Sequence, residues 1–348
     1  MDKKRTKKYL NLLFLILVFA LTFWSVFHGE NLKEVMHHLK TARPMYVFFS
    51  VLCVIFFIIG ESVIIYYLMR TLGNRPRFTH CCLYSFVGFF YSCITPSASG
   101  GQPMQVVYMR KDKIPVAVST VVLAIVTITY KLVLVLIGAT VLLFRPAPVM
   151  VYLESVEPIM YLGLFLNVIC IGLLLLLVFH PHAVRVLAQR CLFLINKIHP
   201  LPHLKKQEER LDRITGQYHG TADYYRNHKH VIVRVFLITL LQRCLLFLVT
   251  WFTYRAFDLS LETLPVILTL QAMISVASDM LPLPGGMGIS ENLFLSIFLP
   301  VFGESLILPG MMISRGISYY TQLLISAVMT VAASFIIKEC KREENPTK

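Results

Sequence analysis

Six ionisable side chains lie within long apolar stretches of the sequence. They are three cations and three carboxylates: Lys131, Arg243, Arg315, Glu61, Asp279 and Glu291. A charge at the centre of a bilayer costs about 2.5–3.5 kcal/mol on insertion scales, so these groups are not expected to face lipid. They either pair with one another, or reach to the membrane surface, or line a polar cavity. For Arg315 and Glu61, a side chain that extends to the membrane surface is an alternative, whereas Lys131 and Arg243 lie nearer the middle of their predicted spans.

The cations favour a particular chemistry. They outnumber the carboxylates that are securely buried, which suits a cavity that receives an anionic group such as a lipid phosphate. Glu61 and Asp279 are then expected as ion-pair or coupling groups, and Glu291 as a group close to the substrate.

Two segments rich in glycine and proline interrupt the apolar sequence. The first offers hydroxyl, amide and backbone N–H groups from Ser97, Ser99, Gly100, Gly101 and Gln102. The second contains Pro284, Gly285, Gly286 and Gly288, just before a helix predicted to begin near residue 289. A cluster of Pro and Gly residues does not continue a helix, and broken backbone survives in hydrocarbon only where protein or water satisfies its hydrogen bonds. Each segment is therefore predicted to be the anion-binding tip of a re-entrant hairpin, the alternative being a plain loop between short helices.

Composition places the chain in a membrane. Of the 348 residues, 56% are hydrophobic and only 15% are charged, with a mean hydropathy of +0.67. Soluble domains are usually near a quarter charged. The longest polar stretch, residues 180–230, is too short for an ordinary enzyme core. The eight cysteines contain no Cys-x-x-Cys pair and are read as small buried hydrophobic residues.

The net charge of +14 gathers in four places: residues 3–8, 110–113, 180–230 and 338–342. The positive-inside rule assigns all four to the cytoplasm, beside anionic lipid head groups, so both termini are predicted to be cytoplasmic. RNA binding is the alternative explanation of this charge, but no nucleic-acid partner is expected. No cofactor and no metal are expected either.

The hydropathy pattern predicts an all-α integral membrane protein with about six spans and two re-entrant helical hairpins. The first half, residues 1–158, has spans at 9–27, 45–68 and 117–144 and a cytoplasmic hairpin at 78–109. The second half, residues 159–348, has spans at 161–179, 231–257 and 311–337 and an outer hairpin at 264–303. The basic segment 180–230 lies between the first two of these later spans. Since Lys131 follows Gly101 by 30 residues and Arg315 follows Gly285 by 30, the halves are predicted to form an inverted repeat.

Three motifs resemble the lysylphosphatidylglycerol-synthase transmembrane family, which includes the membrane half of the bacterial multiple peptide resistance factor. They are Ser99-Gly-Gly-Gln-Pro103, Pro284-Gly-Gly-Met-Gly-Ile-Ser-Glu291 and Arg315-Gly-Ile-Ser-Tyr-Tyr320. The resemblance spans residues 9–337 and adds Tyr319 to the candidate substrate-binding residues. One departure is Lys131, where the family often has Arg. A lysine cannot bind a phosphate in the bidentate manner of an arginine.

The resemblance implies a protein of the bacterial plasma membrane that moves lysyl-phosphatidylglycerol or another anionic or aminoacylated phospholipid between leaflets. A separate aminoacyl-lipid synthase and a second copy of the chain are the protein partners left open. One alternative is a phosphatidylglycerol lysyltransferase, although the family's soluble aminoacyl-transferase domain is expected to be absent because only residues 338–348 follow the last span. The other is a coupled transporter of polyprenyl phosphate or a small anion, which needs a capped pocket where a lipid needs a lateral opening.

Overall fold

The computed structural model describes residues 37, 40–96, 98–179, 220–281, 283 and 288–337. Within these residues the chain is helical and contains no strand. Five stretches of the described chain are long and apolar enough to cross a membrane: Pro44–Thr71, Val116–Phe144, Ala147–Val178, Lys229–Ala256 and Glu304–Ile336. They confirm five predicted spans. The span predicted at 9–27 lies outside the described residues, as do most of the basic segment and the tail.

The long helices carry apolar side chains on all sides, which is typical of helices surrounded by lipid and protein. They are α3 (Pro44–Thr71), α6 (Val116–Phe144), α8 (Glu157–Phe179) and α11 (Lys229–Ala256). The last span consists of α14 (Glu304–Arg315), a π-helical turn η2 (Gly316–Thr321) and α15 (Gln322–Ile336). Local sequence sets several starts: Pro44 and Pro265 occupy the first turns of their helices, where the missing N–H has no helical partner.

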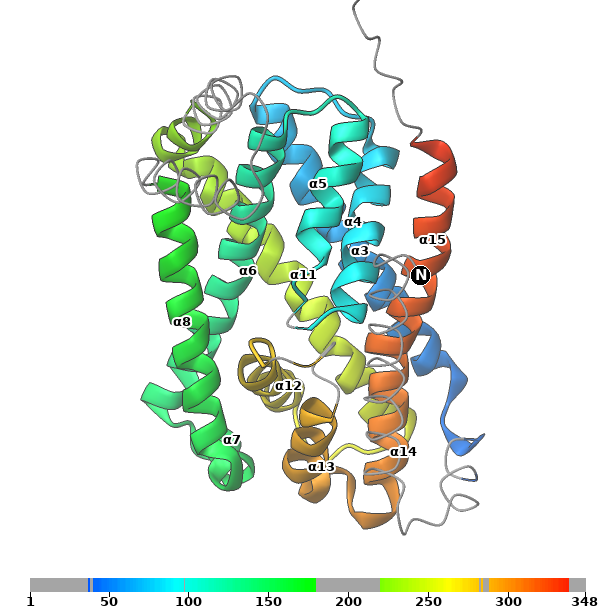
Figure 1. The fold of residues 1–348 in the computed structure, drawn as a ribbon. Coiled ribbons are helices and arrows are strands. Elements are labelled where there is room, and N and C mark those ends of the chain that lie inside the picture. The colour runs from blue at the N-terminus through cyan, green and yellow to red at the C-terminus, as the bar shows by residue number, and fades with distance from the viewer. Residues whose placement is uncertain are drawn as a thin grey trace, which may run out of the picture.

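Two pairs of shorter helices lie between the long ones. The first pair is α4 (Phe78–Ile94) and α5 (Gly101–Lys111), and the second is α12 (Leu264–Ser278) and α13 (Ile289–Phe302). At 1.5 Å per residue the longest of them, α4, reaches about 26 Å, short of the roughly 30 Å hydrocarbon core. Figure 1 shows α4 and α5 in the upper half of the molecule and α12 and α13 in the lower half.

Three boundaries differ from the sequence prediction. The stretch before residue 161, which lies between two predicted spans and is not itself predicted to be helical, is helical in α7 (Ala147–Leu153) and the 3₁₀ turn η1 (Glu154–Val156). The last span begins at Glu304 rather than 311, because Pro309 is accommodated inside α14. In the Arg315-Gly-Ile-Ser-Tyr-Tyr motif, which the sequence places in a plain helix, Arg315 ends α14 and the other five residues lie in the π-helical turn. Such turns are rare and occur frequently at functional sites.

Helices α3 and α11 approach closely at Gly60. A Cβ at this position would lie 2.9 Å from Cγ of Gln242, a contact too short for real side chains. The Gln242 side chain is itself fixed, because its Nε2 donates a hydrogen bond of 2.9 Å to the backbone oxygen of Phe57. Small residues at helix crossings are the usual means by which membrane helices pack. The absence of a side chain at Gly60 therefore brings Glu61 and Arg243, the next residues on the two helices, to the same region.

We expect Gly60→Val to destabilise the protein, because the new side chain must displace Gln242 and break its bond to Phe57. Overpacking of this kind costs typically about 1–3 kcal/mol. Thermal unfolding of the detergent-purified protein measures the effect, with Gly172→Val on α8 as the matched control, since a Cβ there meets nothing within 4 Å. Equal unfolding temperatures for the two variants would show that the α3–α11 crossing is not tightly packed.

Candidate functional site

A cavity of about 460 Å³ lies between the short helix pairs. Helices of both halves line it: α3, α4, α5, α6 and α8 on one side, and α11, α12 and the α14–η2–α15 span on the other. Eight of the residues predicted as site residues line this cavity: Glu61, Ser99, Gln102, Lys131, Arg243, Asp279, Arg315 and Tyr319. Residues far apart in the sequence are thus brought together around one space.

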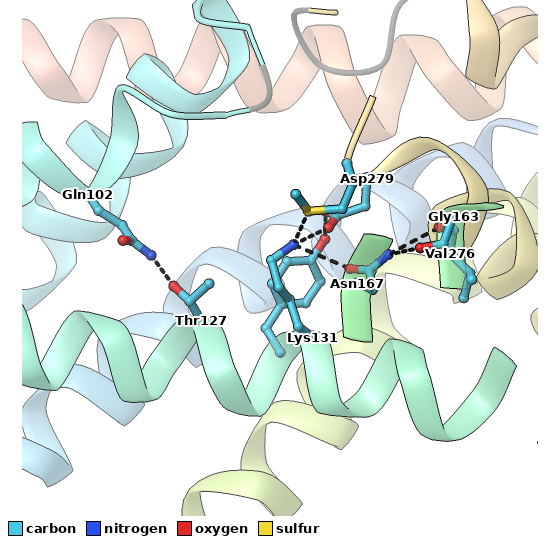
Figure 2. A network of polar contacts seen from close by, with 9 residues as sticks. Gln102, Thr127, Lys131, Gly163, Asn167, Val276 and Asp279 are labelled. Carbon is cyan, nitrogen blue, oxygen red and sulfur yellow. Dashed lines mark hydrogen bonds and ion pairs between the residues drawn. The ribbon is translucent and has the colours of Figure 1, made fainter. Parts of the chain in front are cut away.

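Lys131 and Asp279 form an ion pair that joins α6 to the end of α12. The Lys131 Nζ lies 2.6 Å from Oδ2 of Asp279 and also donates to Asn167 Oδ1 at 3.3 Å, while the Tyr130 hydroxyl donates to Oδ1 of Asp279 (Figure 2). Asn167 in turn donates to the backbone oxygens of Gly163 and Val276, at 2.9 and 3.2 Å. Lys131 is only 6% exposed. A buried ion pair needs such additional hydrogen bonds to offset desolvation.

Arg315 is held by a second ion pair. Its Nε lies 2.9 Å from Oε1 of Glu291, and its guanidinium lies over the Tyr319 ring at 5.2 Å. The other carboxylate oxygen of Glu291 accepts the backbone N–H of Gly288 at 2.7 Å, capping α13. Gly288 has φ of +84°, a conformation that suits glycine. The idea that Arg315 reaches out to the membrane surface is wrong, because this side chain is buried against Glu291.

Arg243 differs from the other two cations. Its guanidinium carbon lies 3.5 Å from the centre of the Tyr130 ring and 4.9 Å from that of Phe57. Among the described residues it forms no ion pair and no hydrogen bond, and its Nε is buried without a partner. Aromatic faces attract a guanidinium but leave its N–H groups unoccupied. Arg243 is thus a buried hydrogen-bond donor that lines the cavity and is unsatisfied within the described part of the chain.

Glu61 also lines the cavity without an ion pair to any described residue. Its Oε1 accepts a hydrogen bond of 2.7 Å from Nε2 of Gln105 on α5. The six charges therefore divide into two ion pairs and two separate groups of opposite sign. The expected excess of cations is wrong for the cluster as a whole, since three carboxylates accompany the three cations. Only Glu291 among the six lies outside the cavity lining.

The glycine-rich segments contribute less to the lining than the sequence predicts. Ser99 and Gln102 line the cavity, and the Gln102 amide donates to the Thr127 hydroxyl (Figure 2). Gly100, Gly101 and Gly288 do not line it. The predictions for Ser97, Pro284, Gly285 and Gly286 fall outside the described residues.

Several lining residues were missed by reasoning from charge alone. The clearest are Gln105, Tyr130, Gln242, Thr250 and Gln271. Two of them adjoin a predicted residue, Tyr130 beside Lys131 and Gln242 beside Arg243, and Gln105 follows Gln102 by one helical turn. An amide or hydroxyl within an apolar helix was the signal available in the sequence.

Within the described part of the chain, no group of three or more His, Cys, Asp and Glu side chains is placed to hold a metal ion. The sequence matches the family described as "Lysylphosphatidylglycerol synthase TM region" over residues 11–326. The chain belongs to this family. The matched range contains every residue that lines the cavity. Membership of the lysylphosphatidylglycerol synthase transmembrane family indicates a lipid-related membrane function. No match was found among curated proteins.

We expect Lys131→Gln to destabilise the protein strongly, because it leaves the Asp279 carboxylate buried without its cation. Removal of one partner of a buried pair costs about 3–5 kcal/mol. The double variant Lys131→Gln/Asp279→Asn should recover most of that loss, since no uncompensated charge remains. Chemical unfolding in detergent measures the cycle. The exposed pair Arg43–Asp258, with side chains 60% and 59% exposed, is the control, and Arg43→Gln should cost less than about 1 kcal/mol. Additive losses in the double variant would show that Lys131 and Asp279 are not coupled.

Proposed function

We propose that this protein translocates a phosphate-bearing lipid, whether anionic, zwitterionic or aminoacylated, between the leaflets of a bacterial plasma membrane. The observation that carries the proposal is Arg243, a guanidinium that lines the cavity without an ion pair or a hydrogen bond to any described carboxylate. A lipid phosphate is the ligand that such a group recognises best, because its oxygens accept two parallel hydrogen bonds from one guanidinium. Family membership supports a lipid as the bearer of that phosphate.

The stacking of Arg243 supports the same ligand. The guanidinium carbon lies 3.5 Å from the centre of the Tyr130 ring, and a guanidinium held against an aromatic face keeps its N–H groups free for hydrogen bonds along its edge. A phosphate arriving in the cavity therefore meets donors that are already oriented. Lys131 and Arg315 are each occupied by a carboxylate, so Arg243 is the cation ready for the first contact.

The walls of the cavity favour a lipid over a small solute. Helix α5 packs against α4 and α6, and α8 packs against α6 and α12, but α5 and α8 do not form a packed pair. On this side the lining includes the exposed Ser99 and Gln102 and the apolar Leu174. A headgroup bound at Arg243 can thus leave its acyl chains in the bilayer. A solute pocket would need no such lateral opening.

The short helix pairs support a mechanism of alternating access. In the proposed topology α4–α5 is a re-entrant hairpin from the cytoplasm and α12–α13 one from outside, related by an inverted repeat, with both termini cytoplasmic. Transporters built in this way bind substrate near the bilayer midplane, between the repeats. The cytoplasmic basic clusters are proposed to contact anionic lipid head groups.

Loss of the Arg243 guanidinium should slow translocation. An ionic hydrogen bond contributes about 1.5–3 kcal/mol, so Arg243→Gln is expected to reduce the rate roughly tenfold to a hundredfold. The measurement is the leaflet accessibility of labelled phosphatidylglycerol and lysyl-phosphatidylglycerol in liposomes that contain the full chain. Arg234→Gln on the same helix, an exposed arginine, is the matched control. Unchanged transport in Arg243→Gln would contradict the proposal, whereas uptake of free phosphate without lipid movement would favour a solute transporter.

The topology makes a separate prediction. Cysteines placed at Arg77, before α4, and at Lys113, after α5, should both react with an impermeant reagent from the cytoplasmic face. A cysteine at Leu261, in the connection between α11 and α12 and 89% exposed, should react from the opposite face; Figure 1 shows these connections at opposite ends of the molecule. Labelling is done in a variant that lacks the eight native cysteines. Reaction of positions 77 and 113 from different faces would show that α4–α5 crosses the membrane.

A further inference from the structure

A site for a phosphate alone does not explain why the Glu61 carboxylate lines the same cavity. Glu61 lines the cavity, and its hydrogen bond from Gln105 uses only Oε1. The charge of Arg243 attracts it without forming an ion pair, and burying a carboxylate that has no ion pair is unfavourable. A purely anionic ligand bound at Arg243 would add a second negative charge to a cavity that already contains this one.

Glu61 and Arg243 are brought together by the packing of their helices. Gly60 and Gln242, the preceding residues on α3 and α11, meet at the closest approach of the two helices, and the Gln242 amide is bonded to the backbone of Phe57. The two charged groups nevertheless do not form an ion pair. Arg243 lies against Tyr130 and Phe57, while Glu61 is held by Gln105 from the α4–α5 side.

The other charges that face the cavity are already compensated. Lys131 is paired with Asp279 and Arg315 with Glu291. Within its described lining, the cavity therefore presents one guanidinium and one carboxylate that form no ion pair. A ligand that matches them carries one phosphate and one ammonium, so that each buried charge gains a partner and the occupied cavity has no net charge.

We propose that Glu61, positioned by Gln105, is an ammonium-binding subsite, and that the preferred lipid has a zwitterionic headgroup with a single amine. This inference rests on the proposed function and narrows its substrate class. A headgroup without an amine leaves Glu61 unpaired. A headgroup with two amines, such as that of lysyl-phosphatidylglycerol, introduces a second ammonium for which the described cavity lining has no unpaired carboxylate.

The test uses lipids that differ only in the amine. Liposomes containing the full chain are supplied with labelled phosphatidylethanolamine or its N-acetyl derivative, which keeps the phosphate and removes the positive charge. We expect the wild-type protein to move phosphatidylethanolamine at least tenfold faster than the N-acetyl lipid, and faster than phosphatidylglycerol or lysyl-phosphatidylglycerol. Glu61→Gln should abolish the preference by slowing the amine-bearing lipid, whereas Arg243→Gln should slow both lipids equally.

Two further variants distinguish a loss of ammonium binding from a general loss of folding. Gln105→Leu leaves the Glu61 charge in place but removes its positioning contact, so the preference should fall to an intermediate value. Glu304→Gln, an exposed carboxylate at the start of α14, should leave the preference unchanged. Equal transport of the two lipids by the wild type, or an unchanged preference in Glu61→Gln, would overturn the ammonium subsite. If transport still depended on Arg243 in that case, the proposed function would stand. Transport indifferent to Arg243 would instead remove the proposed function itself.

Discussion

The ion pair between Lys131 and Asp279 is the contact on which the arrangement of the cavity most depends. Its members are 148 residues apart, and it forms only where α6 and α12 approach around Asn167. In a low-dielectric interior an unpaired charge is costly, so the pair favours this packing over alternatives that separate the two helices. The Arg315–Glu291 pair acts similarly between α14 and α13. Together they fix the walls within which Arg243 and Glu61 remain available.

Hydrogen bonds between uncharged polar groups connect other helices that line the cavity. Membrane helices lack the hydrophobic drive that packs soluble ones, so small residues and interhelical hydrogen bonds gain importance. Gln242 bonds α11 to α3, and Thr250 links α11 to α12 through Gln271 and to α14 through Ser314, both at 2.9 Å. These bonds lie beside the cavity, which explains why polar side chains occur in the lining of helices that are otherwise apolar.

The length and position of the helices could be predicted from the sequence, because hydropathy and breaks by glycine and proline are local properties. The spans near residues 45–68, 117–144 and 231–257 and the short pairs at 78–109 and 264–303 needed no knowledge of contacts. The pairing of charges could not be predicted, since it depends on which helices become neighbours. Charge alone gave no reason to match Lys131 with Asp279 rather than Glu61, or to place Tyr130 under Arg243. The π-helical turn at Gly316–Thr321 likewise reflects tertiary packing that helix propensity does not report.

The way in which each cation is stabilised affects how easily it could bind a phosphate in the proposed transport. A ligand shifts a conformational equilibrium only by binding one state more tightly than another. A phosphate that had to displace Asp279 from Lys131, or Glu291 from Arg315, would first break a buried pair and lose most of its binding energy. Arg243 avoids this competition, because aromatic rings hold its position without occupying its N–H groups. Binding there can add a partner without removing one. In the proposed translocation mechanism the ion pairs remain intact when a headgroup is bound, and the free energy of that binding is available to move the helices that they connect.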